Sequence, residues 1–384
     1  MTNDALQHKV ISDIPAFRAL QPEWDALWHT AQGEHFQAFA YCASSLEIVA
    51  AAARHKLHCV VGRRRGVLKA LWPLVSYRKL CWRFVQPLAP AYNPPHDMLV
   101  EPGPDAANLV AATWRAMLAS VRPDLVYLPR VRSGSLLHRC VTSDARVAHR
   151  LDESTPVALL REHAEWPAFC RSRIGRSRNP PAYLRRRIAA QGAIAIAIVD
   201  HTDSRAASFV DWLLLHKRRW AQRGDVESAW LFSDDSRQFL IRLMTQGDGQ
   251  SRLFRLFVLT LDGAPVAINL LAVRSHCVDL IMNTYDAAYA RLSPGTVLID
   301  ACVNWAFDNH LDFDFGAGGQ SYKQFWSNGV AYATESLHLA HTQWGLAGYR
   351  LSQGALWARE RVAWLRERAS DTGAGKPAES STAG

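Results

Sequence analysis

The sequence has no pair of cysteines at the spacing of a metal site. Seven cysteines are scattered along 384 residues, and none forms a Cys-x-x-Cys pair: Cys42, Cys59, Cys81, Cys140, Cys170, Cys277 and Cys302. Zinc sites usually use such closely spaced ligands, so we expect no metal. An odd number of cysteines, together with no secretory leader, indicates a reducing cytoplasm.

Three nucleotide-binding and catalytic motifs are also missing. No G-x-G-x-x-G opens a helix after a strand, no G-x-x-x-x-G-K-[ST] occurs, and no G-x-S-x-G is present. These absences argue against a dinucleotide-dependent oxidoreductase, a P-loop ATPase and an α/β-hydrolase.

Long apolar runs are absent as well. No uninterrupted apolar stretch reaches about 18 residues, the length that a membrane-spanning helix needs. The first residues, MTNDALQHKVISD, have no basic segment followed by an apolar one, so they do not resemble a signal peptide. We therefore expect no membrane span and a cytoplasmic location.

Composition is that of a globular protein with an excess of positive charge. Hydrophobic residues make up 49% and charged residues 21%, which is enough to build a core. The formal net charge of +9 favours an anionic partner such as a phosphorylated cofactor, a nucleotide sugar, a nucleic acid or an acidic membrane. Charge alone does not choose among these partners.

One stretch, residues 278–326, organises the chain. Val278–Tyr285 is apolar and β-branched, which predicts a buried strand. Ser293 and Pro294 are suited to the N-cap and first position of a helix, and apolar residues then recur at helical spacing. After His310 the period changes to two, which predicts a short strand over 311–315. Together these elements predict a strand–helix–strand unit.

Such a unit brings two kinds of chemistry together. The start of its helix offers unpaired N–H groups and a positive dipole, which favour an anionic group. The end of its second strand is expected to expose side chains for chemistry, and here these are Asp314, Tyr322 and Lys323.

The motifs of this stretch resemble the acetyltransferase domain of the CelD-type proteins, named for cellulose biosynthesis. The resemblance rests on L-S-P-G-T-x-L, D-F-x-x-G and Y-K-x-x-[FW], and extends back through 214–220 and 261–267. It implies the GNAT superfamily, close to the Fem-type transferases. The implied fold is α/β with a mixed sheet, the GNAT-like acyl-CoA N-acyltransferase fold.

A weak internal repeat suggests that this fold occurs twice. Residues 56–77 and 253–273 both read as two strands around a turn, with Gly66 and Gly263 in comparable places. Chance similarity of two common hairpins is the alternative. Tandem halves imply a degenerate half at 1–155 and a GNAT-like acetyltransferase domain at 156–345. Amphipathic spacing predicts a helix at 346–368, and a small, polar composition predicts a disordered tail at 369–384.

The resemblance also implies roles for individual residues. Arg291, Ser293, Gly295 and Thr296 would flank the pyrophosphate of acetyl-CoA or another acyl-CoA. Asp314 would be the base, directly or through water, Tyr322 the acid that protonates the thiolate, and Lys323 would lie near the acceptor or the developing negative charge. His216, Arg219 and Trp220 would bind the acceptor, an amino group of a sugar or polysaccharide precursor. The usual signature [QR]-x-x-G-x-[GA] is altered here: the glycine falls one place late, and Pro294 removes an amide.

Structural explanations stand beside these roles. Asp314 could only cap a turn or pair with an arginine, Tyr322 could be an ordinary edge aromatic, and His216 lies among apolar residues as core histidines do. The basic run over 165–192, with Arg171, Arg173, Arg176, Arg178, Arg185, Arg186 and Arg187, is either a phosphate clamp or a solvated helix face.

Other functions stay open. The first is a Fem-like aminoacyl-tRNA-dependent transferase, favoured by the basic charge and the altered pyrophosphate loop. The second is a non-catalytic accessory protein of the polysaccharide-synthesis machinery. We expect no nucleic-acid partner other than tRNA under the first alternative, because the basic residues are not interleaved with aromatics in a stacking motif.

Overall fold

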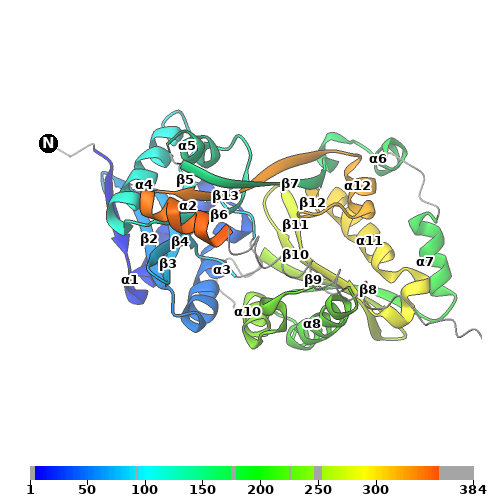
Figure 1. The fold of residues 1–384 in the computed structure, drawn as a ribbon. Coiled ribbons are helices and arrows are strands. Elements are labelled where there is room, and N and C mark those ends of the chain that lie inside the picture. Colours follow the sequence, from blue (N-terminus) through cyan, green and yellow to red (C-terminus); the bar gives the residue numbers. More distant parts are fainter. Residues whose placement is uncertain are drawn as a thin grey trace, which may run out of the picture.

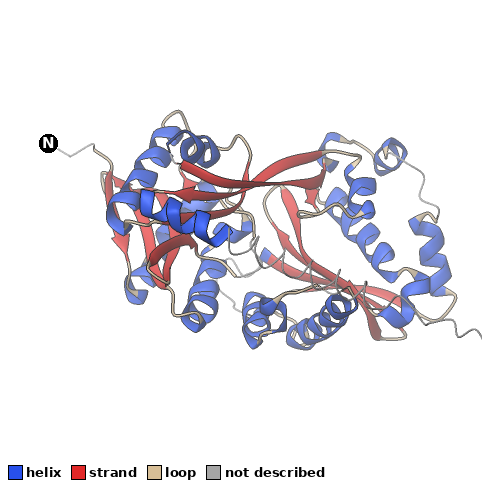
Figure 2. Ribbon diagram, in the orientation of Figure 1, coloured by secondary structure: helices blue, strands red, loops and turns tan. Residues whose placement is uncertain are grey.

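Two α/β halves lie side by side and are joined by two long strands that run from one to the other (Figures 1 and 2). The structure is a computed structural model that describes residues 5–90, 94–144, 146–173, 179–224, 226–245 and 253–353. The N-terminal half comprises β1 (Gln7–Ile11), α1 (Ile14–Ala19), α2 (Gln21–Thr30), η1 (His35–Gln37), α3 (Phe39–Ser44), η2 (Ser45–Ala50), β2 (Lys56–Arg64), β3 (Val67–Lys79), β4 (Trp82–Pro87), β5 (Leu99–Val100), α4 (Ala106–Val121), β6 (Leu125–Arg132) and α5 (Leu136–Asp144).

The joining strands are β7 (Arg146–Ala158) and β13 (Ala331–Ala340), which pair antiparallel along their length. The C-terminal half lies between them in sequence: η3 (Leu160–Glu162), α6 (Trp166–Ser172), α7 (Pro181–Ala189), β8 (Ile194–Val199), α8 (Ala206–Arg223), α9 (Ala229–Phe232), α10 (Asp234–Thr245), β9 (Phe254–Leu261), β10 (Ala264–Val273), β11 (Cys277–Tyr285), η5 (Ala287–Leu292), α11 (Pro294–Asp308), β12 (Asp312–Asp314) and α12 (Ser321–Ser327).

The strand order shows that the two halves share one topology. The order is β1-β2-β3-β4-β6-β13-β7-β12-β11-β10-β9-β8, so reading inward from either edge gives the same sequence of connections. In each half the fourth and fifth strands are parallel and a helix connects them: β4, α4 and β6 in one, β11, α11 and β12 in the other. The mixed sheet and the tandem GNAT-like halves predicted from sequence are confirmed.

The internal repeat has a matching turn at its centre. Arg65 and Gly66 join β2 to β3 with φ of 51° and 80°, and Asp262 and Gly263 join β9 to β10 with φ of 49° and 80°. Two consecutive residues at positive φ form the tight hairpin turn whose twist suits antiparallel strands, and glycine takes the second position without strain. The two hairpins thus agree in backbone conformation as well as in position.

The predicted strand–helix–strand unit is present, with one difference at its helix start. Pro294 is the first residue of α11, as expected, but Ser293 has φ of 55° and its side chain makes no capping hydrogen bond. The serine hydroxyl therefore does not cap the helix, because the left-handed backbone replaces the extended conformation of an ordinary N-cap. The period of two is borne out, since Leu311, Phe313 and Phe315 are all buried.

The halves share a hydrophobic core. Tyr41 of α3 packs edge-on against Phe239 of α10, with ring centres 5.3 Å apart, and stacks near Phe254 of β9. These residues belong to one continuous apolar cluster that includes α1–α3, β2, β3, α8, α10, β9 and β10. A second cluster on the opposite face holds α7 and α11 against β9–β12. Contact between the halves is thus apolar and extensive, which fixes the space between them.

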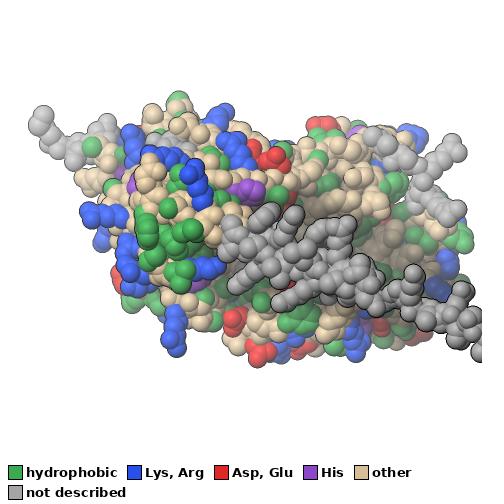
Figure 3. Space-filling view, in the orientation of Figure 1, with side chains coloured by type: hydrophobic (Ala, Val, Ile, Leu, Met, Phe, Trp, Pro, Cys, Tyr) green, Lys and Arg blue, Asp and Glu red, His purple; other side chains and the backbone are tan. Residues whose placement is uncertain are grey.

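After β13 the chain returns to the N-terminal half. Residues 343–353 are helical, and Tyr349 packs with Leu125 and Ala340. Figure 3 shows hydrophobic side chains gathered on this side of the molecule, where Trp344 and Leu351 are exposed. The predicted helix over 346–368 is described only to 353, and the predicted tail at 369–384 lies outside the described residues. The domain boundaries stay a prediction.

Candidate active site

A cavity of about 490 Å³ lies between the two halves. Its walls come from the segment before η1, residues 94–97 and β6 on one side, and from α8, β11, the turn after β12, α12 and β13 on the other. Within the described ranges, no helix combines the length and the apolar character that crossing a bilayer requires. Among the same residues, no cluster of His, Cys, Asp or Glu side chains is arranged to hold a metal ion.

One wall of the cavity is an edge of β11 along which β11 and β12 no longer pair. β11 and β12 pair only over Cys277–Asp279 opposite Asp312–Asp314. Among the described residues, no strand pairs with this edge of β11 from Leu280 to Tyr285, and all of these residues line the cavity. Unpaired backbone N–H and C=O groups at a strand edge are a template for an extended ligand.

The predicted catalytic residues come together on the cavity wall. Asp314, Tyr322 and Lys323 all line it. The sequence predicted exposed side chains, but Asp314 is only 9% and Lys323 only 6% exposed. Residues of both halves line this cavity, so these side chains are enclosed by both. The environment is therefore one in which charges are poorly solvated and interact strongly.

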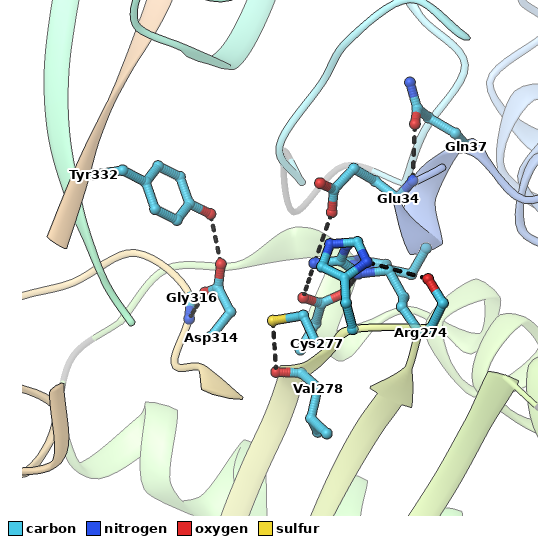
Figure 4. Close-up of polar contacts among 12 residues, drawn as sticks. Glu34, Gln37, Arg274, Cys277, Val278, Asp314, Gly316 and Tyr332 are labelled. Atoms are coloured by element: carbon cyan, nitrogen blue, oxygen red, sulfur yellow. Dashed lines mark hydrogen bonds and ion pairs between the residues drawn. The ribbon is translucent and has the colours of Figure 1, made fainter. Parts of the chain in front are cut away.

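Both oxygens of Asp314 accept hydrogen bonds. The Tyr332 hydroxyl donates to Oδ2 at 2.6 Å, and the Gly316 N–H donates to Oδ1 at 2.7 Å (Figure 4). Burial and the nearby Asp279 nevertheless raise the pKa of Asp314, outweighing these two donors. Asp314 thus holds Tyr332 and the turn at Gly316 in place.

Lys323 is a buried amine held by carbonyl groups. Its Nζ donates to Gly316 O at 3.1 Å and to Ala317 O at 2.6 Å. Burial lowers the pKa of Lys323 to about 8, although Asp314 partly opposes the shift. This amine is hydrogen-bonded to carbonyls and lies on the wall of a cavity. Its positive charge can therefore stabilise negative charge on a ligand.

Tyr322 lies beside the open edge of β11. The Asn283 side-chain amide donates to its hydroxyl at 3.4 Å. Burial raises the pKa of Tyr322, so the phenol keeps its proton at neutral pH. A protonated phenol next to the strand edge has the chemistry of a general acid.

Lys217 was not singled out from the sequence, yet it lies in the same wall. Its Nζ donates to Asn283 O at 3.3 Å and lies 4.0 Å from the centre of the Trp220 ring. Burial lowers the pKa of Lys217 to about 8. Lys217, Trp220 and Arg223 all line the cavity because they recur every three residues along α8.

The other predicted acceptor residues lie elsewhere. His216 stacks on Trp212 with ring centres 4.0 Å apart, and its Nδ1 lies 3.8 Å from Asp286. Burial lowers the pKa of His216. Neither His216 nor Arg219 lines the cavity, whereas Trp220 does. His216 therefore occupies the core position that was its alternative interpretation.

The predicted pyrophosphate residues stand just outside the cavity. Arg291, Ser293, Gly295 and Thr296 do not line it. A Cβ built on Gly295 would lie 3.2 Å from the ring of Tyr285, which does line the cavity. The start of α11 is thus separated from the cavity by one aromatic ring.

An ion-pair network at the inner end of the cavity joins the two halves. Arg274 contacts Asp279 through Nε at 2.7 Å and Nη2 at 2.8 Å, and also reaches Glu34 at 3.0 Å (Figure 4). His35 Nδ1 lies 2.7 Å from Asp279. Burial alone would raise the pKa of Asp279, but Arg274 and His35 outweigh it and hold that pKa well below its usual range.

Sequence reasoning missed this network. His35 precedes its partner Asp279 by 244 residues. Neither periodicity nor a local motif signals a contact over that distance. The one local signal is the E-x-x-Q spacing of Glu34 and Gln37, a helix-start pattern.

Comparison with known proteins agrees with this fold. Residues 176–324 match the family model described as "Acetyltransferase (GNAT) domain". This segment is therefore similar to a GNAT acetyltransferase domain. The match ends at Gln324, directly after Tyr322 and Lys323.

Solved structures agree on the fold. FemX has 11% identity and a TM-score of 0.60, covering 90% of this chain and 99% of its own. L-PGS from Bacillus licheniformis has 10% identity and a TM-score of 0.52, covering 88% and 96%. At these identities the likeness concerns the fold alone. No curated protein matches the sequence.

Proposed function

We propose that the protein is an acyl-CoA-dependent N-acyltransferase, with acetyl-CoA the simplest donor. The observation that carries the proposal is the opening of the sheet between β11 and β12, where the free edge of β11 lines a cavity that Asp314 and Lys323 also line. An extended pantetheine arm can bond to such an edge as an added strand would. Its thioester would then lie among the buried acid, base and cation.

The residues of the wall supply the steps of direct transfer. Lys323 stabilises the negative charge that develops on the thioester oxygen, and Tyr322 protonates the departing thiolate. A carboxylate at the inner end of the cavity takes the proton of the acceptor amine, and Asp314 is the one predicted from sequence. Arg291, Ser293, Gly295 and Thr296, beyond Tyr285, would bind the pyrophosphate.

The acceptor that we propose is an amino group of a sugar or polysaccharide precursor, in the manner of the CelD-type proteins. The mixture of carboxylates and cations on the cavity wall supports a polar acceptor bearing an amine. Under this proposal the protein works in the cytoplasm, beside the machinery that makes the polysaccharide.

Binding of the donor is expected to stabilise the fold. Any ligand that binds only the native state raises the free energy of unfolding, by about 2.7 kcal/mol at a concentration 100 times its Kd. We expect acetyl-CoA or a longer acyl-CoA to raise the melting temperature, measured by differential scanning fluorimetry. Free pantetheine and ATP serve as controls for the two ends of the molecule. No shift across a panel of thioesters would contradict acyl-CoA as the donor.

A second candidate is the Fem-like aminoacyl-tRNA-dependent transferase. It is favoured by the net charge of +9 and by Pro294, which removes an amide from the helix start where a pyrophosphate would bind. Against it, Lys and Arg side chains on the face shown in Figure 3 are dispersed over both halves. Charged tRNA that binds with a steep salt dependence would support this candidate over the first.

A further inference from the structure

Four carboxyl groups line the cavity: Glu34, Asp97, Asp279 and Asp314. They differ in how many hydrogen bonds and ion pairs their oxygens already make. Asp279 is bound by Arg274 at both oxygens and also by His35. Asp314 accepts one hydrogen bond at each oxygen. Both are at least nine-tenths buried. These two carboxylates therefore serve first as structural partners.

Asp97 is also engaged. Its Oδ1 accepts a hydrogen bond from the N–H of Met98 at 2.7 Å, and Ser135 donates to the same carboxylate. Burial raises the pKa of Asp97 to about 6. Two hydrogen-bond donors, Met98 and Ser135, therefore hold the Asp97 carboxylate.

Glu34 is different. Its contact with Arg274 is 3.0 Å long, and 38% of its side chain remains exposed, facing the cavity that it lines. Asp279, by comparison, has a side chain that is 8% exposed. Arg274 makes its two shorter contacts with Asp279, so it binds Glu34 less fully. Glu34 thus combines an accessible carboxylate with a fixed partner behind it.

The backbone on either side of Glu34 is fixed. Its N–H donates to Gln37 Oε1 at 2.8 Å (Figure 4). Its carbonyl accepts from Trp28 Nε1 at 2.9 Å. The next residue, His35, is bound to Asp279 of the other half. A carboxylate on so constrained a backbone keeps its direction, as a catalytic group must.

Burial brings the proton affinity of Glu34 near neutrality. It raises the pKa of Glu34 to about 7, with Arg274 and His35 opposing the rise and Asp279 and Asp314 adding to it. A general base works best when its pKa lies near the working pH.

We propose that Glu34, supplied by the N-terminal half, is the general base that takes the proton of the acceptor amine. The inference rests on the proposed function and assigns to Glu34 the role predicted for Asp314, which positions Tyr332 instead. The acceptor binds as an ammonium ion and gives one proton to the Glu34 carboxylate. The free amine attacks the thioester carbon, the C–N bond forms and the C–S bond breaks. Tyr322 gives its proton to the departing thiolate, and the second nitrogen proton passes through water to the resulting tyrosinate, which restores the phenol. Glu34 releases the first proton to water.

The proposal implies that the family-matching segment is incomplete alone. Residues 176–324 contain Tyr322 and Lys323, but the base reaches the site from outside that segment. The shared core and the Arg274–Asp279–His35 network then serve catalysis, because Arg274 holds the Glu34 carboxylate in the wall of the cavity that β11 also lines.

Glu34→Gln in the full chain tests this role. Gln keeps the shape and can still accept from Arg274, but it cannot take a proton. With acetyl-CoA and a panel of amino sugars, amino acids and alkyl amines, released thiol measures the rate. We expect kcat to fall about 10²- to 10⁴-fold, with KM for acetyl-CoA within twofold. The rise in rate as pH increases through about 7, where wild-type Glu34 loses its proton, should disappear. Methoxyamine, already neutral at pH 7, should be transferred at near wild-type rates.

Matched variants keep the test decisive. Glu23→Gln, an exposed glutamate on α2 paired with Arg63, should change nothing. Asp314→Asn should slow the reaction but keep the pH-dependent rise. If Glu34→Gln melts early, Glu34→Asp decides, since it should keep the rise at reduced kcat. A Glu34→Gln enzyme with wild-type kcat or an unchanged pH profile would overturn the assignment. A wild-type protein that transfers acetyl to no amine would instead overturn the proposed function, and this inference with it.

Discussion

Replacing Lys323 by Met should lower kcat for acyl transfer about 10²- to 10³-fold, the usual loss when one donor to a developing oxyanion is removed. Lys323 is 6% exposed, and two backbone carbonyls hold its amine on the cavity wall. Met keeps most of the volume while removing the charge. Steady-state kinetics with saturating acetyl-CoA measure the effect.

The pH dependence of the wild-type enzyme gives the same role a second test. Because burial lowers the pKa of Lys323 to about 8, the charged form is lost as pH rises through that value. The rate should therefore fall on the alkaline side of pH 8. Lys56→Met, on the exposed start of β2, is the control and should leave both kcat and the pH profile unchanged. A Lys323→Met enzyme within threefold of wild type would exclude the residue from charge stabilisation.

Asp279→Asn should produce the largest loss of stability. Removing one partner of a buried ion pair costs about 3–5 kcal/mol, because the other charge stays buried without compensation. Here Arg274, which is 7% exposed, would keep one carboxylate partner, Glu34. The free energy of unfolding from urea titration, monitored by tryptophan fluorescence, measures the change.

Acid should have the same effect on the wild-type protein. Asp279 has a folded-state pKa held well below the unfolded value of about 3.9. Its contribution is therefore complete above that value and is lost as pH falls through the folded pKa. Asp211→Asn removes an exposed pair with Arg237 and should cost at most about 1 kcal/mol. Equal losses for the two variants would show that the buried network does not join the halves.

Local pattern was enough to predict the elements that surround the site. The period-two run over 311–315, the hairpins at Gly66 and Gly263, and Pro294 at the start of α11 are all set by neighbours in sequence. Asp314, Tyr322 and Lys323 follow one another closely, so placing the strand end also placed them together. Their burial could not be foreseen, because it depends on α12 and on the opposite half.

It was harder to predict which residue on a helix face points into the cavity, and which residues far apart in sequence meet. On α8 the prediction chose His216 with Trp220, four residues apart, whereas Lys217 with Trp220, three apart, faces the cavity. Both spacings lie on one side of a helix, so sequence alone does not decide between them. Glu34 and Arg274 meet only because the two halves share a core, and no pattern within either half reports it.

The most direct test of the account is amide hydrogen exchange with and without acetyl-CoA. The claim is that the donor lies along the open edge of β11. Peptides covering 280–285 and the start of α11 should exchange more slowly when acetyl-CoA is bound. The equivalent strand β4 in the N-terminal half should be unchanged. Slower exchange confined to other regions, with β11 exchanging as it does in the free protein, would contradict the account.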